Sequence, residues 1–148
     1  MLRRVGEKGD KPLYLIDTSA LYPLILQLRE NIVEIKDKIR ALSLTHYEIG
    51  NVLWKEFRKG KIKNLERTVK MFTAVLDQLK VIHIGTSDLG EVLNVALENK
   101  ITYYDAAYVY ASRKYNLKLV TLDRDLLKFE NTIPLNMFLK EIKKNLPA

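Results

Sequence analysis

Apolar residues follow two kinds of pattern along this chain. Apolar-rich runs occupy 13–16, 81–84 and 117–121, and such short runs indicate buried strands. Across 21–41, 45–60, 62–79, 86–97 and 103–115 the apolar residues recur every three or four positions, which predicts amphipathic helices. Residues 132–135 are a candidate last strand, and 42–44 are either a short strand or a loop. Strands that alternate with helices predict an α/β fold with a mostly parallel sheet covered on both faces.

Length and composition indicate one globular domain. The chain has 148 residues and 47% of them are apolar, which is enough for a substantial core. Residues 1–12 contain two Gly, one Pro and mixed charges, so we expect a flexible leader there. The remaining residues, 13–148, are expected to form a single domain.

Charge and cysteine content narrow the function classes. The sequence has no Cys, which excludes disulfides and thiolate zinc sites and fits a reducing cytoplasmic location. No apolar run approaches the ~18 residues of a membrane span, so no membrane association is expected. The net charge of +7 favours nucleic acid as a partner. A lysine-rich solvated surface explains the same charge equally well.

The run that ends in Asp17 carries the first chemical signal. Four apolar residues lead directly into an acid and two hydroxyl residues, Thr18 and Ser19. Thr18 or Ser19 is expected to cap the helix that follows. Asp17 then lies at the carboxyl end of a central strand, where open α/β sheets bind their ligands.

Further acids occupy similar positions at the starts of predicted helices and turns: Glu48, Asp105, Asp123 and Asp125. Four of the acids have a structural explanation: Thr45 and Thr102 precede Glu48 and Asp105 by three residues in capping-box patterns, and Asp17 and Asp123 can each cap the helix that follows. Together, however, these positions converge on one edge of a parallel sheet. Carboxylates that gather there repel one another unless a cation such as Mg²⁺ or Mn²⁺ binds between them.

Four segments in this order resemble the signature segments of PIN-domain proteins: Leu15-Ile16-Asp17-Thr18-Ser19, Tyr47-Glu48-Ile49-Gly50-Asn51-Val52-Leu53, Tyr104-Asp105-Ala106-Ala107-Tyr108 and Val120-Thr121-Leu122-Asp123-Arg124-Asp125-Leu126. The resemblance spans about residues 13–135 and is nearest to VapC-like toxins. It implies a three-layer α/β/α sandwich around a sheet of four or five mostly parallel strands. It also implies an Mg²⁺- or Mn²⁺-dependent ribonuclease, an antitoxin partner and a homodimer.

The resemblance also assigns roles to individual residues. Asp17, Glu48, Asp105 and Asp123 become the catalytic, metal-binding acids. Thr18, Ser19, Thr121 and Asn51 become polar neighbours of those acids, and Asp125 either assists Asp123 or replaces it.

Basic residues near the acids are candidates for binding RNA. Lys55, Arg58 and Lys59 follow Glu48 at helical spacing, and Arg124 stands next to Asp123. The alternative is a solvated helix face. Trp54 is expected at a helix–helix contact, and core or dimer contacts are expected for the tyrosines Tyr103, Tyr104, Tyr108 and Tyr110, in preference to stacking on bases.

Two functions remain as hypotheses. The first is an endoribonuclease that hydrolyses RNA phosphodiester bonds at the four-acid metal site. The second is a PIN-like module that binds RNA or protein without cleaving it. A phosphoacceptor receiver domain is disfavoured, because the chain lacks paired acids after its first strand and a Lys after its last.

Overall fold

The computed structural model describes residues 13–145, which form one parallel five-stranded sheet in the order β3-β2-β1-β4-β5. The predicted α/β class is therefore confirmed. The strands are β1 Tyr14–Ile16, β2 Ile39–Leu42, β3 Lys80–Ile82, β4 Lys118–Val120 and β5 Thr132–Ile133. The leader predicted for residues 1–12 lies outside the described residues.

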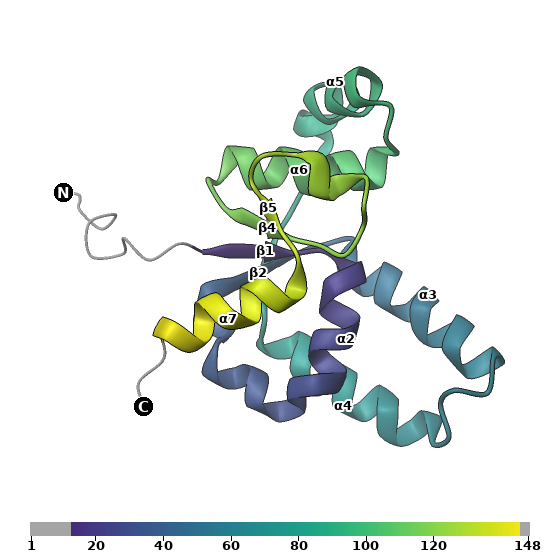
Figure 1. Cartoon of the computed structure of the whole chain (residues 1–148). Helices are drawn as coiled ribbons and strands as arrows, with labels where there is room; N and C mark the ends of the chain where they lie inside the picture. The colour runs from purple at the N-terminus through teal and green to yellow at the C-terminus, as the bar shows by residue number, and fades with distance from the viewer. Residues whose placement is uncertain (1–12, 146–148) are drawn as a thin grey trace.

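Helices connect the strands and cover both faces of the sheet (Figure 1). They are α2 Thr18–Leu28, α3 Thr45–Arg58, α4 Leu65–Gln78, α5 Leu89–Asn99, α6 Tyr103–Lys114 and α7 Leu135–Asn145. Short 3₁₀ turns occur at η1 Arg29–Glu34, η2 Lys36–Lys38, η3 Thr86–Asp88 and η4 Leu126–Lys128. No helix within residues 13–145 has the length and apolar character that crossing a membrane requires.

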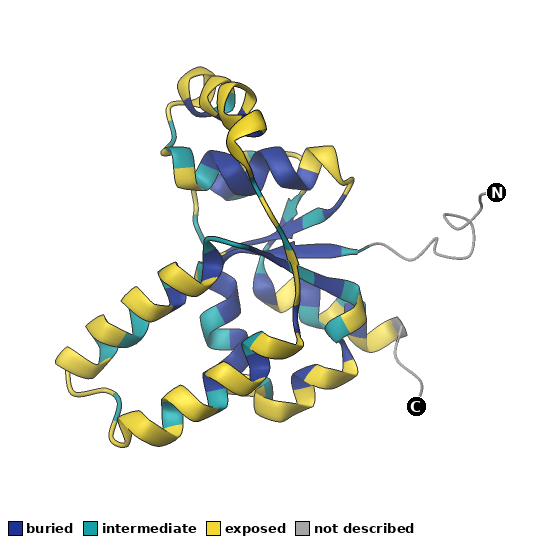
Figure 2. Ribbon diagram, turned by 180° about the vertical axis from the view of Figure 1, so that it is seen from behind, coloured by how far each residue is buried: buried dark blue, intermediate teal, exposed yellow. Residues whose placement is uncertain are grey.

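The sheet separates two apolar cores, which gives the expected three layers. Tyr14 and Ile16 of β1 face the core formed with α2, α4 and α7, whereas Leu15 faces the core formed with α5 and α6. This alternation follows from the two-residue period of a strand. Strand β1 and the middle of α6 are buried, whereas the edge strand β3 is largely exposed and α3 and α4 carry much exposed surface (Figure 2).

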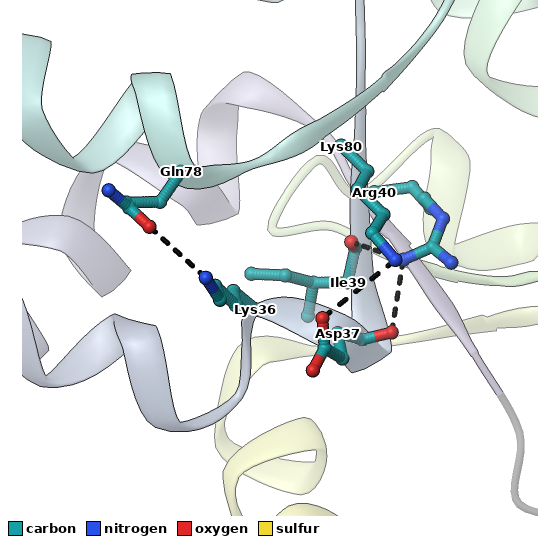
Figure 3. Close-up of polar contacts among 6 residues, drawn as sticks. All are labelled: Lys36, Asp37, Ile39, Arg40, Gln78 and Lys80. Carbon is teal, nitrogen blue, oxygen red and sulfur yellow. Dashed lines mark hydrogen bonds and ion pairs between the residues drawn. The ribbon is translucent and has the colours of Figure 1, made fainter.

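The region before β2 differs from the prediction. Helical periodicity was expected to continue through residue 41, but the chain forms η1 and η2 and then enters β2 at Ile39. Polar contacts hold this entry in place (Figure 3): Arg40 donates to the carbonyls of Asp37 at 3.0 Å and Ile39 at 2.9 Å, and Lys36 donates to Gln78 at 3.2 Å. Pairing with β1 and β3 overrides the local pattern, because a central strand satisfies its backbone groups on both sides.

The predicted helical hairpin over residues 45–79 is present. Helices α3 and α4 extend away from the sheet toward the loop that joins them (Figure 1). Gly60 in that loop has a φ of 78°, a conformation that favours glycine. The first turn of α3 lies at the sheet, so the hairpin begins beside the edge where the acids were predicted to meet.

Candidate functional site

The four predicted acids occupy the carboxyl edge of the sheet. Asp17 directly follows β1, and Asp123 follows β4, the neighbouring strand. Glu48 lies in the first turn of α3, which follows β2, and Asp105 lies in the first turn of α6. The chain leaves β1 and β4 toward opposite sides of the sheet, so their carboxyl ends form the switch point at which such folds bind ligands.

Asp17 is the most buried of these acids, with only 4% of its surface exposed. Its Oδ1 accepts hydrogen bonds from Ser19 Oγ at 2.6 Å and from Ala20 N at 3.1 Å, and its Oδ2 accepts one from Thr121 Oγ1. Asp17 therefore caps α2, which confirms the structural explanation for this acid, and the alternative that Thr18 or Ser19 provides the cap is wrong. Burial, with a smaller contribution from the charge of Asp105, raises the pKa of Asp17 to about 6 despite these hydrogen bonds.

The hydroxyls of Ser19 and Thr121 also position the loop after β4. Ser19 Oγ accepts a hydrogen bond from Leu122 N at 2.9 Å, and Thr121 Oγ1 accepts one from Asp123 N at 3.0 Å. Asp123 Oδ1 in turn accepts from the backbone N of Asp125 at 2.9 Å, which closes the turn. The same two side chains thus bind Asp17 and set the backbone that carries Asp123.

The carboxylate of Glu48 is held by two hydroxyls from other helices. Its Oε1 accepts from Thr18 Oγ1 at 2.7 Å and from Tyr108 OH at 2.7 Å. The capping-box alternative for this acid is wrong, because the hydroxyl of Thr45 instead accepts from Leu42 N at 3.1 Å. Glu48 therefore has no helix-capping role and points into a polar cluster.

One half of the capping box predicted for Thr102 and Asp105 is present. Thr102 caps α6 by accepting a hydrogen bond from Asp105 N at 3.1 Å. The pKa of the Asp105 carboxyl is nevertheless raised, first by burial and then by the negative charges of Asp123 and Glu48. The acids are thus close enough to repel one another.

No Lys or Arg within residues 13–145 forms an ion pair with Asp17, Glu48, Asp105 or Asp123. Across the same residues, no three His, Asp or Glu side chains are grouped closely enough to hold a metal ion. We call Asp17, Glu48, Asp105 and Asp123 the acid rim. Their charges interact, but their side chains are not close enough together to form a complete set of metal ligands. The donor chemistry of these acids fits a hard divalent cation, since carboxylate oxygens are the ligands that such ions prefer and no cation from the described part of the chain pairs with them.

The remaining predicted residues lie on exposed surface. Asn51, Lys55 and Arg124 are exposed, Lys59 pairs with Glu56 at 3.7 Å, and Asp125 pairs with Lys128 at 3.7 Å. The guanidinium of Arg58 lies 5.1 Å from the ring centre of Trp54. Trp54 is 55% exposed, so the expected burial of this ring at a helix–helix contact is wrong.

Sequence reasoning missed Tyr108 and Thr45 as members of the site. Tyr108 was assigned to core or dimer contacts, and Thr45 was considered only as a cap. Tyr108 is buried, but its hydroxyl contacts Glu48, Thr18 and Thr45. Burial raises the pKa of Tyr108, as does the charge of Glu48, so the phenol stays protonated. The available signal was the position of Tyr108 three residues after Asp105, on the same helix face.

Comparison with known proteins identifies the family of the chain. A family model described as the PIN domain matches residues 14–131. The chain therefore belongs to the PIN-domain family, as its four segments predicted, and the match runs from β1 through the turns that follow β4.

Relatives with VapC names place the chain within that family. It is 41% identical over 114 residues to "Exonuclease VapC9" of Pyrobaculum aerophilum, covering 77% of this chain and 83% of the relative. It is 32% identical over 119 residues to "Ribonuclease VapC3" of the same organism, covering 76% and 90%. The chain is thus a VapC-like PIN-domain protein whose relatives are named as nucleases.

Solved structures support the fold independently. The crystal structure of PAE2754 from Pyrobaculum aerophilum has a TM-score of 0.81 and 36% identity, and the match covers 90% of each chain. A toxin–antitoxin complex from Klebsiella pneumoniae has a TM-score of 0.57 at 18% identity, covering 81% of this chain and 95% of the other. The second likeness is one of fold alone.

Proposed function

We propose that this protein is a divalent-metal-dependent endoribonuclease. The observation that carries the proposal is the rim of four acids at the β1/β4 switch point, where the charge of Asp105 acts on the other acids and no Lys or Arg of the described residues 13–145 forms an ion pair with them. A site of this kind is costly for the free protein and favours a bound cation. The names of the VapC relatives support nucleic acid cleavage as its purpose.

Asp17, Glu48, Asp105 and Asp123 would hold Mg²⁺ or Mn²⁺. A bound ion of this type lowers the pKa of its water and neutralises charge that develops on a phosphodiester. Ser19 and Thr121 would keep Asp17 and the loop of Asp123 in register with each other. Ligation would involve side-chain adjustment at the rim, because three carboxylates do not meet closely within residues 13–145.

A circular RNA tests the mode of cleavage, because only an endonuclease can open it. This choice matters, since one relative is named an exonuclease and the other a ribonuclease. We expect the wild type to open the circle with Mg²⁺ or Mn²⁺ and to be inactive in EDTA. Degradation of linear RNA with the circle intact would replace the endonuclease proposal by an exonuclease, and activity in EDTA would remove the metal from the proposal.

A non-catalytic RNA- or protein-binding module is the second candidate. The absence of a closed ligand set among residues 13–145 favours it. This candidate predicts RNA binding that is unaffected by EDTA and by Asp105→Asn. Cleavage assays with and without Mn²⁺ separate the two functions, because only the nuclease requires metal to cut RNA, and a filter-binding titration shows whether a protein that does not cleave still binds RNA.

We also propose that RNA reaches the rim along α3, through Lys55, Arg58 and Lys59, and that Arg124, next to Asp123 in the sequence, binds a phosphate beside the acids. Seven Lys or Arg and two Glu lie between residues 55 and 70, which span the end of α3, the loop after it and the start of α4. This segment, the α3 arm, therefore carries excess positive charge. Exposed cations of this kind bind phosphate without regard to base sequence. Competition by poly-uridine, but not by an uncharged polymer, checks this part of the proposal.

An antitoxin partner and a homodimer are further parts of the proposal. The VapC-like relationship supports an antitoxin. Three leucines spaced by four residues on α5, Leu89, Leu93 and Leu97, are 54%, 44% and 70% exposed, which supports a protein contact on that helix. Light scattering of the purified chain measures its mass, and co-purification with the product of an adjacent gene tests the antitoxin.

A further inference from the structure

Tyr108 lies at the centre of a buried hydroxyl cluster that ends on Glu48. Its phenol oxygen is 2.7 Å from Glu48 Oε1, 2.8 Å from Thr45 Oγ1 and 3.2 Å from Thr18 Oγ1. Tyr108 is 2% exposed and Thr45 is 1% exposed. These contacts join α2, α3 and α6 at one point beside the acid rim.

The number of protons in the cluster sets the direction of its hydrogen bonds. Thr45 Oγ1 accepts from the backbone N of Leu42 and has one proton to give, which goes to the oxygen of Tyr108. Tyr108 has one proton as well, and Glu48 Oε1 can only accept it while ionised. A single chain of donors therefore runs from the last residue of β2 through Thr45 and Tyr108 to the carboxylate of Glu48.

This series of hydrogen bonds fixes the position of the Glu48 carboxylate relative to β2, and therefore relative to the sheet. Without it, the carboxylate would depend on the rotamers of an α3 side chain that is only half-buried. Thr18 donates to the same oxygen, so both bonds converge on Oε1. Oε2 receives no hydrogen bond from residues 13–145, which leaves it available to a ligand.

We propose that Tyr108 is a positioning residue for the metal site, and that its hydroxyl holds Glu48 by one carboxylate oxygen while the other stays free for the cation. The inference rests on the proposed function, because it assigns Tyr108 a role toward the same metal. Hydrogen-bond partners of metal ligands typically contribute about 10–100-fold in metal affinity or activity.

Tyr110 provides a matched control on the same helix. It is also buried, and its hydroxyl donates to a carboxylate oxygen, Asp88 Oδ1, at 2.6 Å. Asp88 has other partners, Lys114 Nζ at 3.2 Å and Gly85 N at 2.9 Å, and lies outside the acid rim. Tyr110→Phe therefore removes the same group as Tyr108→Phe without touching Glu48.

The test measures Mn²⁺ binding by calorimetry and circular-RNA cleavage, at a temperature at which circular dichroism shows each variant folded. We expect Tyr108→Phe to weaken Mn²⁺ affinity about tenfold or more, and Tyr110→Phe to remain within about twofold of wild type in both assays. In a Glu48→Gln background, Tyr108→Phe should produce no further loss, since the two residues act as one unit.

The outcomes separate the two proposals. Wild-type protein that neither binds Mn²⁺ nor cleaves RNA would overturn the proposed function itself. A wild type that does both, with Tyr108→Phe unchanged in affinity or with additive losses in the double variant, would overturn only the role of Tyr108. Should Tyr108→Phe fail to fold, Thr18→Val removes the other donor to Glu48 Oε1 and is expected to lower Mn²⁺ affinity in the same way.

Discussion

Asp17 and Asp88 are both buried aspartates at helix starts, yet their environments are opposite. They are 4% and 8% exposed, and each accepts a hydrogen bond from a backbone N three residues away. The further partners of Asp17 among the described residues are the hydroxyls of Ser19 and Thr121, and burial raises its pKa to about 6. Hydrogen bonds from Tyr110, Gly85 and Lys114 lower the pKa of Asp88 to about 2.

The difference shows which of the two carboxylates has its negative charge neutralised by another side chain of the protein. Asp88 has the ammonium of Lys114 at 3.2 Å, so its negative charge is neutralised by the protein. Asp17 has no such partner within residues 13–145, and Asp105 adds repulsion. A buried acid with a raised pKa is a candidate for a functional site, which is consistent with the metal site that we propose.

The largest expected effect is on cleavage. Asp17→Asn should lower the rate of circular-RNA cleavage by more than about 100-fold, because a direct metal ligand contributes more than its hydrogen-bond partners. Asp88→Asn is the matched control and should keep the wild-type rate at a temperature where it is folded. Equal losses in the two variants would show that Asp17 acts through stability, and an active Asp17→Asn protein would exclude it from the site.

The pH dependence of stability should distinguish the same two residues. The folded-state pKa of Asp17 is raised, so its contribution to stability is present below pH 3.8 and is lost as pH rises through about 6. In metal-free buffer this loss amounts to roughly 3 kcal/mol, and Asp17→Asn should lack it. Urea unfolding between pH 3.5 and pH 7 compares the two proteins.

Asp88 should show the opposite sign. Its folded-state pKa is lowered, so its contribution is present above pH 3.8 and is lost as pH falls through about 2. Asp88→Asn should therefore be less stable than wild type at pH 7 and converge with it in acid. An Asp17→Asn variant that behaves like Asp88→Asn would mean that Asp17 is a structural cap without excess charge.

Metal should stabilise the protein through the rim alone. At 100 times its dissociation constant a ligand adds about 2.7 kcal/mol, which raises Tm by roughly 5–10 °C in a domain of this size. Differential scanning fluorimetry with Mn²⁺ measures the shift. Asp105→Asn should reduce the shift and Asp88→Asn should retain it, whereas an equal shift in both would place the ion elsewhere.

The smallest effect is expected on the α3 arm. Lys55→Ala should weaken RNA binding modestly and reduce the slope of log K against log salt by about one. The cleavage rate at saturating RNA should not change, since Lys55 lies outside the acid rim. Glu56→Ala, which removes a negative charge from the same helix, is the control of opposite sign. An unchanged salt slope in Lys55→Ala would show that Lys55 is only a solvated surface lysine.

Much of the fold and the chain positions of the acids could be predicted before the structure. Apolar patterns located most helices and the strands β1, β3, β4 and β5, and four short segments identified the family. The start of β2 at Ile39 was missed, because pairing with strands distant in sequence overrides helical spacing. Trp54 was misplaced because periodicity identifies an apolar face without saying whether another element covers it.

Local patterning determined that Asp17 ends a buried strand and that the other acids start helices or turns, since both signals depend on neighbouring residues. Tertiary structure alone decided the partners of those acids. Asp17 meets Thr121 across 104 positions and Glu48 meets Tyr108 across 60. A hydrogen bond between such distant residues depends on the packing of whole helices against the sheet, as does the contrast between Asp17 and Asp88.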